Sequence, residues 1–330
     1  MTNIPLLEYF EAVFSEEDKS QLLTSNTLSN ISDTTNEEWE TIESDFIQLL
    51  NNQNKLQNFG VLTNDTAGGF IENIFNNCDE NTFVIASITH SKVNEGLSKI
   101  THKYIVSAED IKNDTLLDIY TKYKNSGCSK ILIYLGGIIE HTLVPMQYLY
   151  DIKAFFVSKD VIPTFVLDDV GSMFLISKDY NIFDYIIFNS YSLIPEFKGG
   201  ILLYNKKMPQ PVIGGKDKAL NIWIDLLKKI LIKKDNILQF NEMLLKYFSE
   251  YTHLFKIFNV PHIFCLSYKN NTNFNIIIDK YKNKLKEYNI ICEDCAIIIR
   301  CNHFLCQDID NITVGLSLLM KVLNRCNTLN

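Results

Sequence analysis

The sequence predicts an α/β protein built around a largely parallel sheet, and three observations support that fold class. From Asp45 onward, short β-rich apolar runs alternate with amphipathic segments of helical length, a pattern typical of βαβ units. With 330 residues and 46% apolar content, the chain can bury a sizeable core. After Gly214 and Gly215 the pattern changes to long helical segments, so we expect a large domain followed by a smaller α+β domain.

Seven segments have the length and composition of strands. They are residues 58–63, 82–87, 103–106, 130–135, 164–168, 185–188 and 201–204. Segments with helical periodicity lie at 68–77, 91–100, 115–126, 145–159, 218–233 and 236–258, followed by a strand, a helix and a strand. Pro145 suits a first helical turn, because its missing N–H has no partner there. An irregular stretch replaces a helix between the last two strands, which predicts a mainly parallel sheet of about seven strands.

Three parts follow along the chain. Residues 1–44 mix an apolar start with a polar run and show no sustained period, so we expect a loosely packed arm. Residues 45–215 would form the large sheet-bearing domain, and residues 216–330 the small C-terminal domain.

Composition argues against several classes of function. The net charge of −8 and the scattered lysines make nucleic acid an unexpected partner. No apolar run approaches the roughly 20 residues of a membrane helix, and the N-terminus lacks the pattern of a signal peptide. Eight dispersed cysteines suit reduced thiols. We therefore expect a cytoplasmic protein that does not bind membranes.

Candidate site residues follow the strands, because ligands of open α/β sheets bind outside the carboxyl ends of strands. After the first strand comes a turn that contains Thr66, Ala67 and two glycines and leads into a helix N-terminus, where phosphate could bind. His90 follows the second strand and Asp168 ends the fifth. Taken singly, such residues are more often helix caps or structural hydrogen-bond partners. Their order along the chain is more informative.

That order, completed by Lys198-Gly199-Gly200 before a strand, resembles the fold-type-I enzymes that depend on pyridoxal phosphate. The resemblance is greatest to the group II amino-acid decarboxylases, and within them to histidine decarboxylase, and it covers residues 45–207 best. It implies that His90 stacks on the cofactor ring and that Asp168 pairs with the pyridine nitrogen, which makes the ring an electron sink. It also implies a homodimer with the site at the subunit interface.

The resemblance also shows where this chain departs from the family. Counting back from Lys198 puts the Schiff-base lysine at residue 192, preceded by histidine, but the sequence has Tyr191 and Ser192. Serine has no amine and cannot form an imine with the cofactor aldehyde. In the phosphate turn, Asp65 and Thr66 replace two glycines, and Ala67 replaces a phosphate-binding hydroxyl. A carboxylate next to a phosphate dianion is repulsive.

Two more departures fall on the expected walls of the cofactor site. Gly137 and Ile138 replace a pair of hydroxyl residues, and Asp169 and Val170 replace small alanines, which adds charge and bulk. Together the changes predict a catalytically inactive homologue, or pseudoenzyme, with no cofactor expected and pyridoxal phosphate bound only if the site survives. The vestigial cofactor site would consist of Thr66, Ala67, His90, Asp168, Tyr191 and Ser192.

Three alternatives stay open. An active carboxy-lyase would need another amine, and Lys198 would have to swing into the site from the end of the loop. A scaffold acting through its surface would bind itself, an active relative or another protein. A zinc site could use Cys292, Cys295, Cys301 and nearby His303 and Cys306; however, residues 296–300 have the pattern of a strand that would hold the two groups about 15 Å apart, so we expect no metal.

Overall fold

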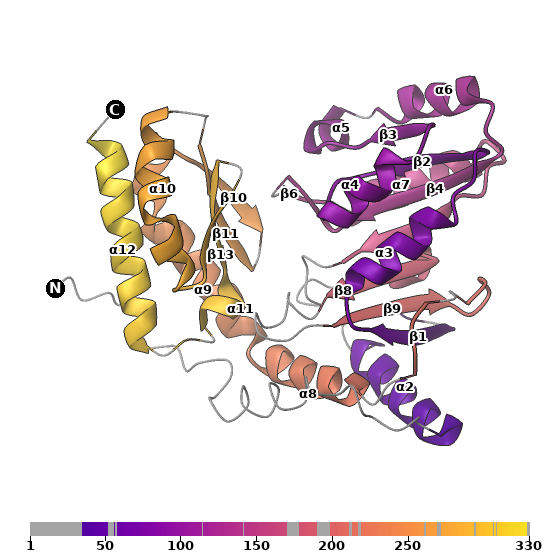
Figure 1. The fold of residues 1–330 in the computed structure, drawn as a ribbon, viewed down its shortest axis with the longest axis horizontal. Coiled ribbons are helices and arrows are strands. Elements are labelled where there is room, and N and C mark those ends of the chain that lie inside the picture. The colour runs from indigo at the N-terminus through magenta and orange to yellow at the C-terminus, as the bar shows by residue number, and fades with distance from the viewer. Residues whose placement is uncertain are drawn as a thin grey trace. The chain divides into compact units, whose positions relative to one another are not determined.

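The computed structural model describes residues 35–51, 56, 58–113, 115–140, 142–169, 178–189, 199–210, 213–216, 219–260, 262–268, 272–293, 295–305, 307 and 309–328. The chain forms two compact units that divide after Leu226, within helix α8 (Ala219–Ile232). The first unit contains a seven-stranded sheet, and the second combines helices with a four-stranded sheet (Figure 1). The predicted α/β architecture with a smaller C-terminal α+β part is confirmed.

The large sheet has the strand order β1-β9-β8-β7-β4-β2-β3. Its strands are β1 (Phe59–Asn64), β2 (Thr82–Ala86), β3 (Lys103–Ile105), β4 (Lys130–Gly136), β7 (Thr164–Asp168), β8 (Tyr185–Asn189) and β9 (Gly200–Asn205). Six strands run in the same direction, and β9 alone is antiparallel to its two neighbours. All seven predicted strands are present, with ends within one residue of the prediction.

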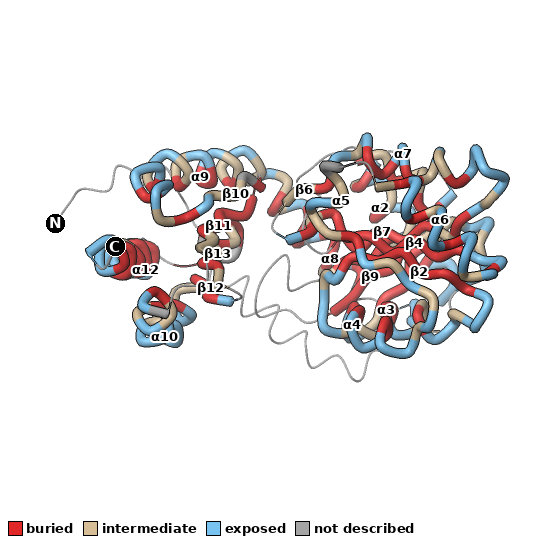
Figure 2. The backbone as a smooth tube through the Cα atoms, turned by 90° about the horizontal axis from the view of Figure 1, so that it is seen from above, coloured by how far each residue is buried: buried red, intermediate tan, exposed pale blue. Residues whose placement is uncertain are grey.

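Helices cover both faces of this sheet. They are α3 (Ala67–Asn76), α4 (Ser91–Ser98), α5 (Ala108–Asn113), α6 (Leu116–Ser126) and α7 (Met146–Val157). Figure 2 shows α3 and α4 on one side of the buried strands and α7 on the other. Under α3 and α4, Phe70 and Phe75 pack with strand residues such as Tyr134 and Val166 in one core cluster. A short hairpin, β5 (Ile138–Ile139) and β6 (Thr142–Leu143), follows β4.

Helix α2 (Asn36–Asn51) covers the edge strand β1. Thr35 and Glu38 form a capping box, in which each side chain accepts the other residue's backbone N–H. Trp39 is buried, and Glu43 accepts the Val61 N–H at 2.8 Å, so the side chain satisfies part of the exposed sheet edge. Residues 36–44 of the predicted arm are therefore helical, and the arm's first 34 residues lie outside the described part of the chain.

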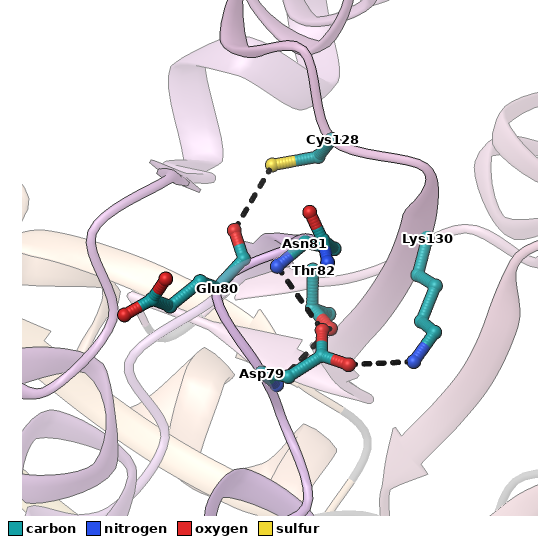
Figure 3. A network of polar contacts seen from close by, with 6 residues as sticks. All are labelled: Asp79, Glu80, Asn81, Thr82, Cys128 and Lys130. Carbon is teal, nitrogen blue, oxygen red and sulfur yellow. Dashed lines mark hydrogen bonds and ion pairs between the residues drawn. The ribbon is translucent and has the colours of Figure 1, made fainter.

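A turn before β2 fixes the register between β2 and β4 at the amino ends of both strands (Figure 3). Asp79 accepts hydrogen bonds from the Thr82 hydroxyl at 2.8 Å and from the Lys130 ammonium at 2.6 Å. Thr82 and Lys130 are the first register pair of these two strands. The backbone carbonyl of Asn81 accepts the Lys130 N–H. Register at one end of the sheet determines which residues reach the other end.

The second unit is an antiparallel sheet with helices. Its elements are α9 (Lys234–Tyr247), a 3₁₀ turn (Ser249–Tyr251), β10 (Lys256–Val260), β11 (Ile263–Ser267), α10 (Thr272–Lys286), β12 (Ile290–Glu293), β13 (Ala296–Arg300), α11 (Cys301–Leu305) and α12 (Ile309–Asn327), with strand order β10-β11-β13-β12. The expectation of one helix over 236–258 is wrong. Phe248, Tyr251 and Phe255 are buried at helical spacing, yet Phe258 pairs with Cys265 across two strands. Short apolar runs do not distinguish the two structures.

Within the described residues, no helix has both the length and the apolar character needed to cross a membrane.

We predict that Trp39→Ala destabilises the sheet-bearing unit by about 3–5 kcal/mol, because a fully buried indole is replaced by a cavity. The exposed Thr41 on the same helix provides the control, and Thr41→Ala should change stability by less than about 0.5 kcal/mol. Urea unfolding followed by far-UV circular dichroism measures both. Equal midpoints for the two variants would show that α2 is not part of the folded unit.

Candidate functional site

The candidate site lies at the carboxyl edge of the large sheet. Because β1, β2, β4, β7 and β8 are parallel, their carboxyl ends meet at one edge. The antiparallel β9 starts at the same edge, where Gly200 pairs with Asn64 and Asn189. The sheet therefore brings together the turn after β1, the Thr89-His90 segment after β2, and Asp168 at the end of β7.

Asp168 is the centre of this edge. Asp168 is 2% exposed, and one of its carboxylate oxygens, Oδ2, accepts hydrogen bonds from two described residues. The Thr89 hydroxyl donates at 2.5 Å and the Tyr134 hydroxyl at 2.8 Å. Burial, and then the charge of Asp168, raises the pKa of Tyr134 well above its ordinary value, so Tyr134 keeps its proton and acts as a donor.

Two small residues make room for Thr89. A Cβ added to Gly136 would lie 2.3 Å from Thr89 Cγ2, so only glycine permits this approach. The Gly136 N–H donates to Ser87 Oγ at 2.8 Å. The hydroxyl of Ser87 and the absent side chain of Gly136 thus fix the position from which Thr89 reaches Asp168.

His90 begins helix α4 at the same edge. It is exposed, and its Nδ1 accepts the Lys92 N–H at 3.1 Å, which makes it the N-cap of α4. The preceding residue, Thr89, is the one that contacts Asp168. Stacking of His90 on a ring stays a prediction.

The turn after β1 leads into helix α3. Thr66 is the N-cap of α3, and its hydroxyl accepts the Gly69 N–H at 3.4 Å. Ala67 is buried and offers no hydroxyl, while Asp65 is exposed. A Cβ on Gly200 would lie 2.5 Å from the Ala67 nitrogen, so the start of β9 packs directly on this turn. Asp65 places a carboxylate here, Thr66 uses its hydroxyl oxygen as an acceptor, and Ala67 has no hydroxyl.

A buried ion pair occupies the other face of the sheet at this edge. Lys178 binds Asp169, and Tyr180 donates a hydrogen bond to the same carboxylate. A Cβ on Gly137 would lie 2.7 Å from both Lys178 Nζ and Asp169 Oδ1. The expectation that Asp169 adds charge to a cofactor wall is therefore corrected, because Lys178 compensates the charge of Asp169.

Three of the residues in these contacts were not foreseen: Tyr134, Lys178 and Tyr180. Tyr134 lies in an apolar strand and reads as a core residue, and Lys178 follows its partner Asp169 by nine positions without a motif. Tyr191, Ser192, Lys198 and Val170 lie outside the described residues.

The cysteines of the second unit are separated as expected. Strand β13 does lie between Cys292 and Cys295 on one side and Cys301 on the other. Burial raises the pKa of the Cys292 thiol to about 12 and also raises the pKa of Cys301, which disfavours the thiolate that binds zinc. The described residues hold no cluster of three metal-ligating side chains, Cys306 and the side chain of His303 lie outside them, and a metal-free protein stays a prediction.

An open groove of about 800 Å³ lies between α2 and the far ends of β1 and β9. Acidic Glu40 and Glu43 line it together with basic Lys206 and Lys216. It faces Phe59 and Tyr204, at the opposite end of these strands from Asn64 and Gly200, and is separate from the candidate site.

Comparison with solved structures identifies the fold. The chain superimposes with a TM-score of 0.66 on a NifS-like protein from Rickettsia africae, at 11% identity over 94% of this chain and 96% of that one. Histidinol-phosphate aminotransferase from Clostridium acetobutylicum superimposes with a TM-score of 0.62, at 12% identity over 96% of this chain and 97% of that one. Taurine:2-oxoglutarate aminotransferase from Bifidobacterium kashiwanohense was solved with pyridoxal phosphate and glutamate. It superimposes with a TM-score of 0.64, at 10% identity over 94% of this chain and 85% of that one. No family model and no curated protein sequence matches.

The chain thus has the fold of the fold-type-I enzymes that depend on pyridoxal phosphate. The residues present fit that cofactor only in part. Buried Asp168 with its two hydroxyl donors suits a protonated ring nitrogen, but the turn with Asp65 and Ala67 does not suit a phosphate. Serine at residue 192 supplies no amine for the cofactor aldehyde.

We predict that the buried pair of Asp169 and Lys178 is energetically coupled. Lys178→Met leaves a buried carboxylate without its cation and should lower the free energy of unfolding by about 3–5 kcal/mol. Asp169→Asn should also be destabilising, because it removes the carboxylate that binds the buried ammonium. The double variant removes both charges and should lose clearly less than the sum.

Urea unfolding of all four proteins measures this coupling as a double-mutant cycle. Losses that simply add would contradict a direct ion pair at this position.

Proposed function

We propose that this chain is a non-catalytic relative of the group II pyridoxal-phosphate decarboxylases. The observation that carries the proposal is Ser192, which stands where the resemblance places the imine-forming lysine. Without an amine there, the cofactor aldehyde has no nucleophile to join. The structure of the phosphate turn supports the same conclusion, since Thr66 caps its own helix and Ala67 has no hydroxyl.

The competing proposal is an active carboxy-lyase that uses a different lysine. Lys198 and Ser192 both lie outside the described residues. Lys178 is buried at the same edge, but it binds Asp169 on the face opposite Thr89. This contact does not favour Lys178 as a replacement amine, and the test below separates the two proposals.

A non-catalytic chain of this fold would act through its surface, either by assembly with itself or by binding another protein, including an active relative. Fold alone does not establish activity. We expect cytoplasmic localisation, with no part for nucleic acid or membranes, in line with the net charge of −8.

We predict that restoring the lysine does not restore the enzyme. Wild type with added pyridoxal phosphate should show no visible aldimine absorbance and no adduct trapped by borohydride. Ser192→Lys supplies the amine, yet the phosphate still meets Asp65 and lacks hydrogen bonds worth roughly 1.5–3 kcal/mol each. The affinity of this variant for pyridoxal phosphate should therefore be several orders of magnitude lower than that of a site with those hydrogen bonds. The variant should release no carbon dioxide from histidine, glutamate or aromatic amino acids.

Two further variants sharpen this test. Ser192→Met is the control of similar length without an amine, and a triple variant that adds Asp65→Gly and Ala67→Ser to Ser192→Lys should bind the cofactor better than Ser192→Lys alone. Brisk turnover by the single variant would show that only one residue had been lost. A reducible adduct in wild type, mapped by mass spectrometry, would identify a substitute amine such as Lys198.

We predict that the chain forms a homodimer, because the sheet-bearing domain of this fold is expected to bury a broad apolar face against a second copy. Light scattering at micromolar concentration measures the mass directly. A mass near the 38.1 kDa of the monomer would contradict self-association and leave binding to a different protein as the surviving form of the proposal.

A further inference from the structure

We propose that the groove beside the edge strand β1 binds an extended peptide of a partner protein. The peptide adds to the large sheet as a further antiparallel strand and places a basic side chain against helix α2. The inference rests on the proposed function in one respect, because that proposal gives the chain a protein partner, and it adds the surface and the chemistry of the contact. The groove of about 800 Å³ lies between α2 and the ends of β1 and β9, and Figure 1 shows α2 next to β1.

The first observation is a row of unpaired backbone groups on β1, the outermost strand of the sheet next to β9. The Lys206 N–H donates to the Asn58 carbonyl, so the even-numbered positions of β1 pair with β9 and the odd-numbered positions direct their backbone groups outwards. Within the described residues, no hydrogen bond is formed on this outer side by the N–H or carbonyl of Phe59 or by the carbonyl of Val61. Phe59 and Val61 are 4% and 1% exposed, and buried backbone groups without a partner cost free energy. An added strand supplies the missing partners.

The neighbouring contacts give the direction of the added strand. Thr63 and Gly215 exchange two backbone hydrogen bonds, at 3.0 and 2.9 Å, in an antiparallel bridge. A peptide that continues from this bridge runs antiparallel to β1 and meets Val61 before Phe59. Glu43 Oε1 accepts the Val61 N–H at 2.8 Å, in the position that a strand carbonyl takes in a ladder. The peptide carbonyl replaces Glu43 as this acceptor and leaves the carboxylate to bind a basic side chain.

The register determines which peptide side chains meet α2. Leu62 belongs to the core cluster under α3 and α4, and side chains alternate between the faces of a strand, so Phe59 and Val61 point to the other face. Figure 2 shows α2 on that other face, on the same side of the sheet as α7. Directly opposed residues of antiparallel strands point their side chains the same way. The peptide residue opposite Val61 therefore faces α2 beside Glu43, and the next residue faces away from α2.

Charge selects the peptide side chain at that position. Helix α2 has five acidic and no basic residues, and its Glu40 and Glu43, one turn apart, both line the groove. Glu43 pairs with Lys206 at 3.1 Å, while no ion pair to Glu40 forms within the described part of the chain. Lys216 lines the end of the groove next to the antiparallel bridge. A basic side chain opposite Val61 therefore complements the acidic wall that α2 presents.

The N-terminal segment of the same chain is the alternative occupant. Residues 1–34 contain six acidic residues and one basic residue, so their charge does not complement the acidic wall of α2. A basic peptide from a partner protein fits the groove better, and the N-terminal segment enters the experiment as a competitor.

The experiment titrates the full-length protein into a fluorescently labelled peptide and follows binding by anisotropy. The probe is acetyl-Lys-Val-Thr-Val-Thr, labelled at its carboxyl end, in which the lysine stands opposite Val61 and the first threonine opposite Phe59. We expect saturable binding that weakens about fivefold or more when glutamate replaces the lysine. N-methylation of the first threonine removes the N–H that pairs with the Phe59 carbonyl and should weaken binding about tenfold. N-methylation of the valine before it is the control, because that N–H faces away from β1, and it should leave binding almost unchanged.

Variants of α2 test the charge of the groove wall. Glu40→Gln and Glu43→Gln should each weaken binding of the lysine probe about threefold, and Glu43→Gln keeps a side-chain oxygen for the Val61 N–H. Glu37→Gln is the control, since Glu37 is exposed on the same helix and does not line the groove. Glu40→Lys should reverse the preference, so that the glutamate probe binds more tightly than the lysine probe.

Amide NMR of wild type locates the bound probe. The Phe59 N–H gains an acceptor, so its signal should shift downfield more than the amide signals of residues outside β1 and α2. Circular dichroism identifies any variant that fails to fold, and the probe series decides the matter in that case because it needs only wild type.

The inference is overturned if wild type shows no saturable binding at millimolar probe, if the glutamate probe binds as tightly, or if methylation of the first threonine has no effect. It is also overturned if an acetylated peptide of residues 4–14 binds more tightly than the lysine probe, which would assign the groove to the chain's own N-terminal segment. The titration contains no cofactor. A failure here therefore leaves the Ser192 test unaffected, and a reducible adduct there leaves this titration unaffected.

Discussion

The arrangement of the candidate site depends on one constraint, a carboxylate buried at the end of a central strand. Placing Asp168 at the end of β7, between β4 and β8, removes it from water, and a buried charge of this kind is tolerated only with hydrogen-bond donors nearby. The neighbouring strands supply them: Tyr134 from inside β4 and Thr89 from just beyond β2. Gly136 is required because Thr89 passes so close to its backbone.

Two adjacent carboxylates are accommodated at this point in different ways. Side chains alternate between the faces of a strand, so Asp168 meets hydroxyls while Asp169 meets the ammonium of Lys178 beside Gly137. The ion pair compensates the charge of Asp169 within the protein. Asp168 is instead held by two hydroxyls, which donate to the same carboxylate oxygen.

Much of the sheet was predictable, because seven β-rich runs separated by segments of helical periodicity are compatible with few strand arrangements. The position of Asp168 at the carboxyl end of a strand followed directly from the same pattern. Helix α2 was missed, although Thr35 and Glu38 form a capping box at its start, because residues 1–44 show no sustained period and were expected to form a loosely packed arm. The segment around Phe258 was misread because strand pairing with Cys265 is a long-range contact. Lys178 could not be foreseen for the same reason, since only folding brings it to Asp169 and Gly137. Tyr134 has the sequence context of a core residue, and its hydroxyl acquires a role only once β7 lies beside β4.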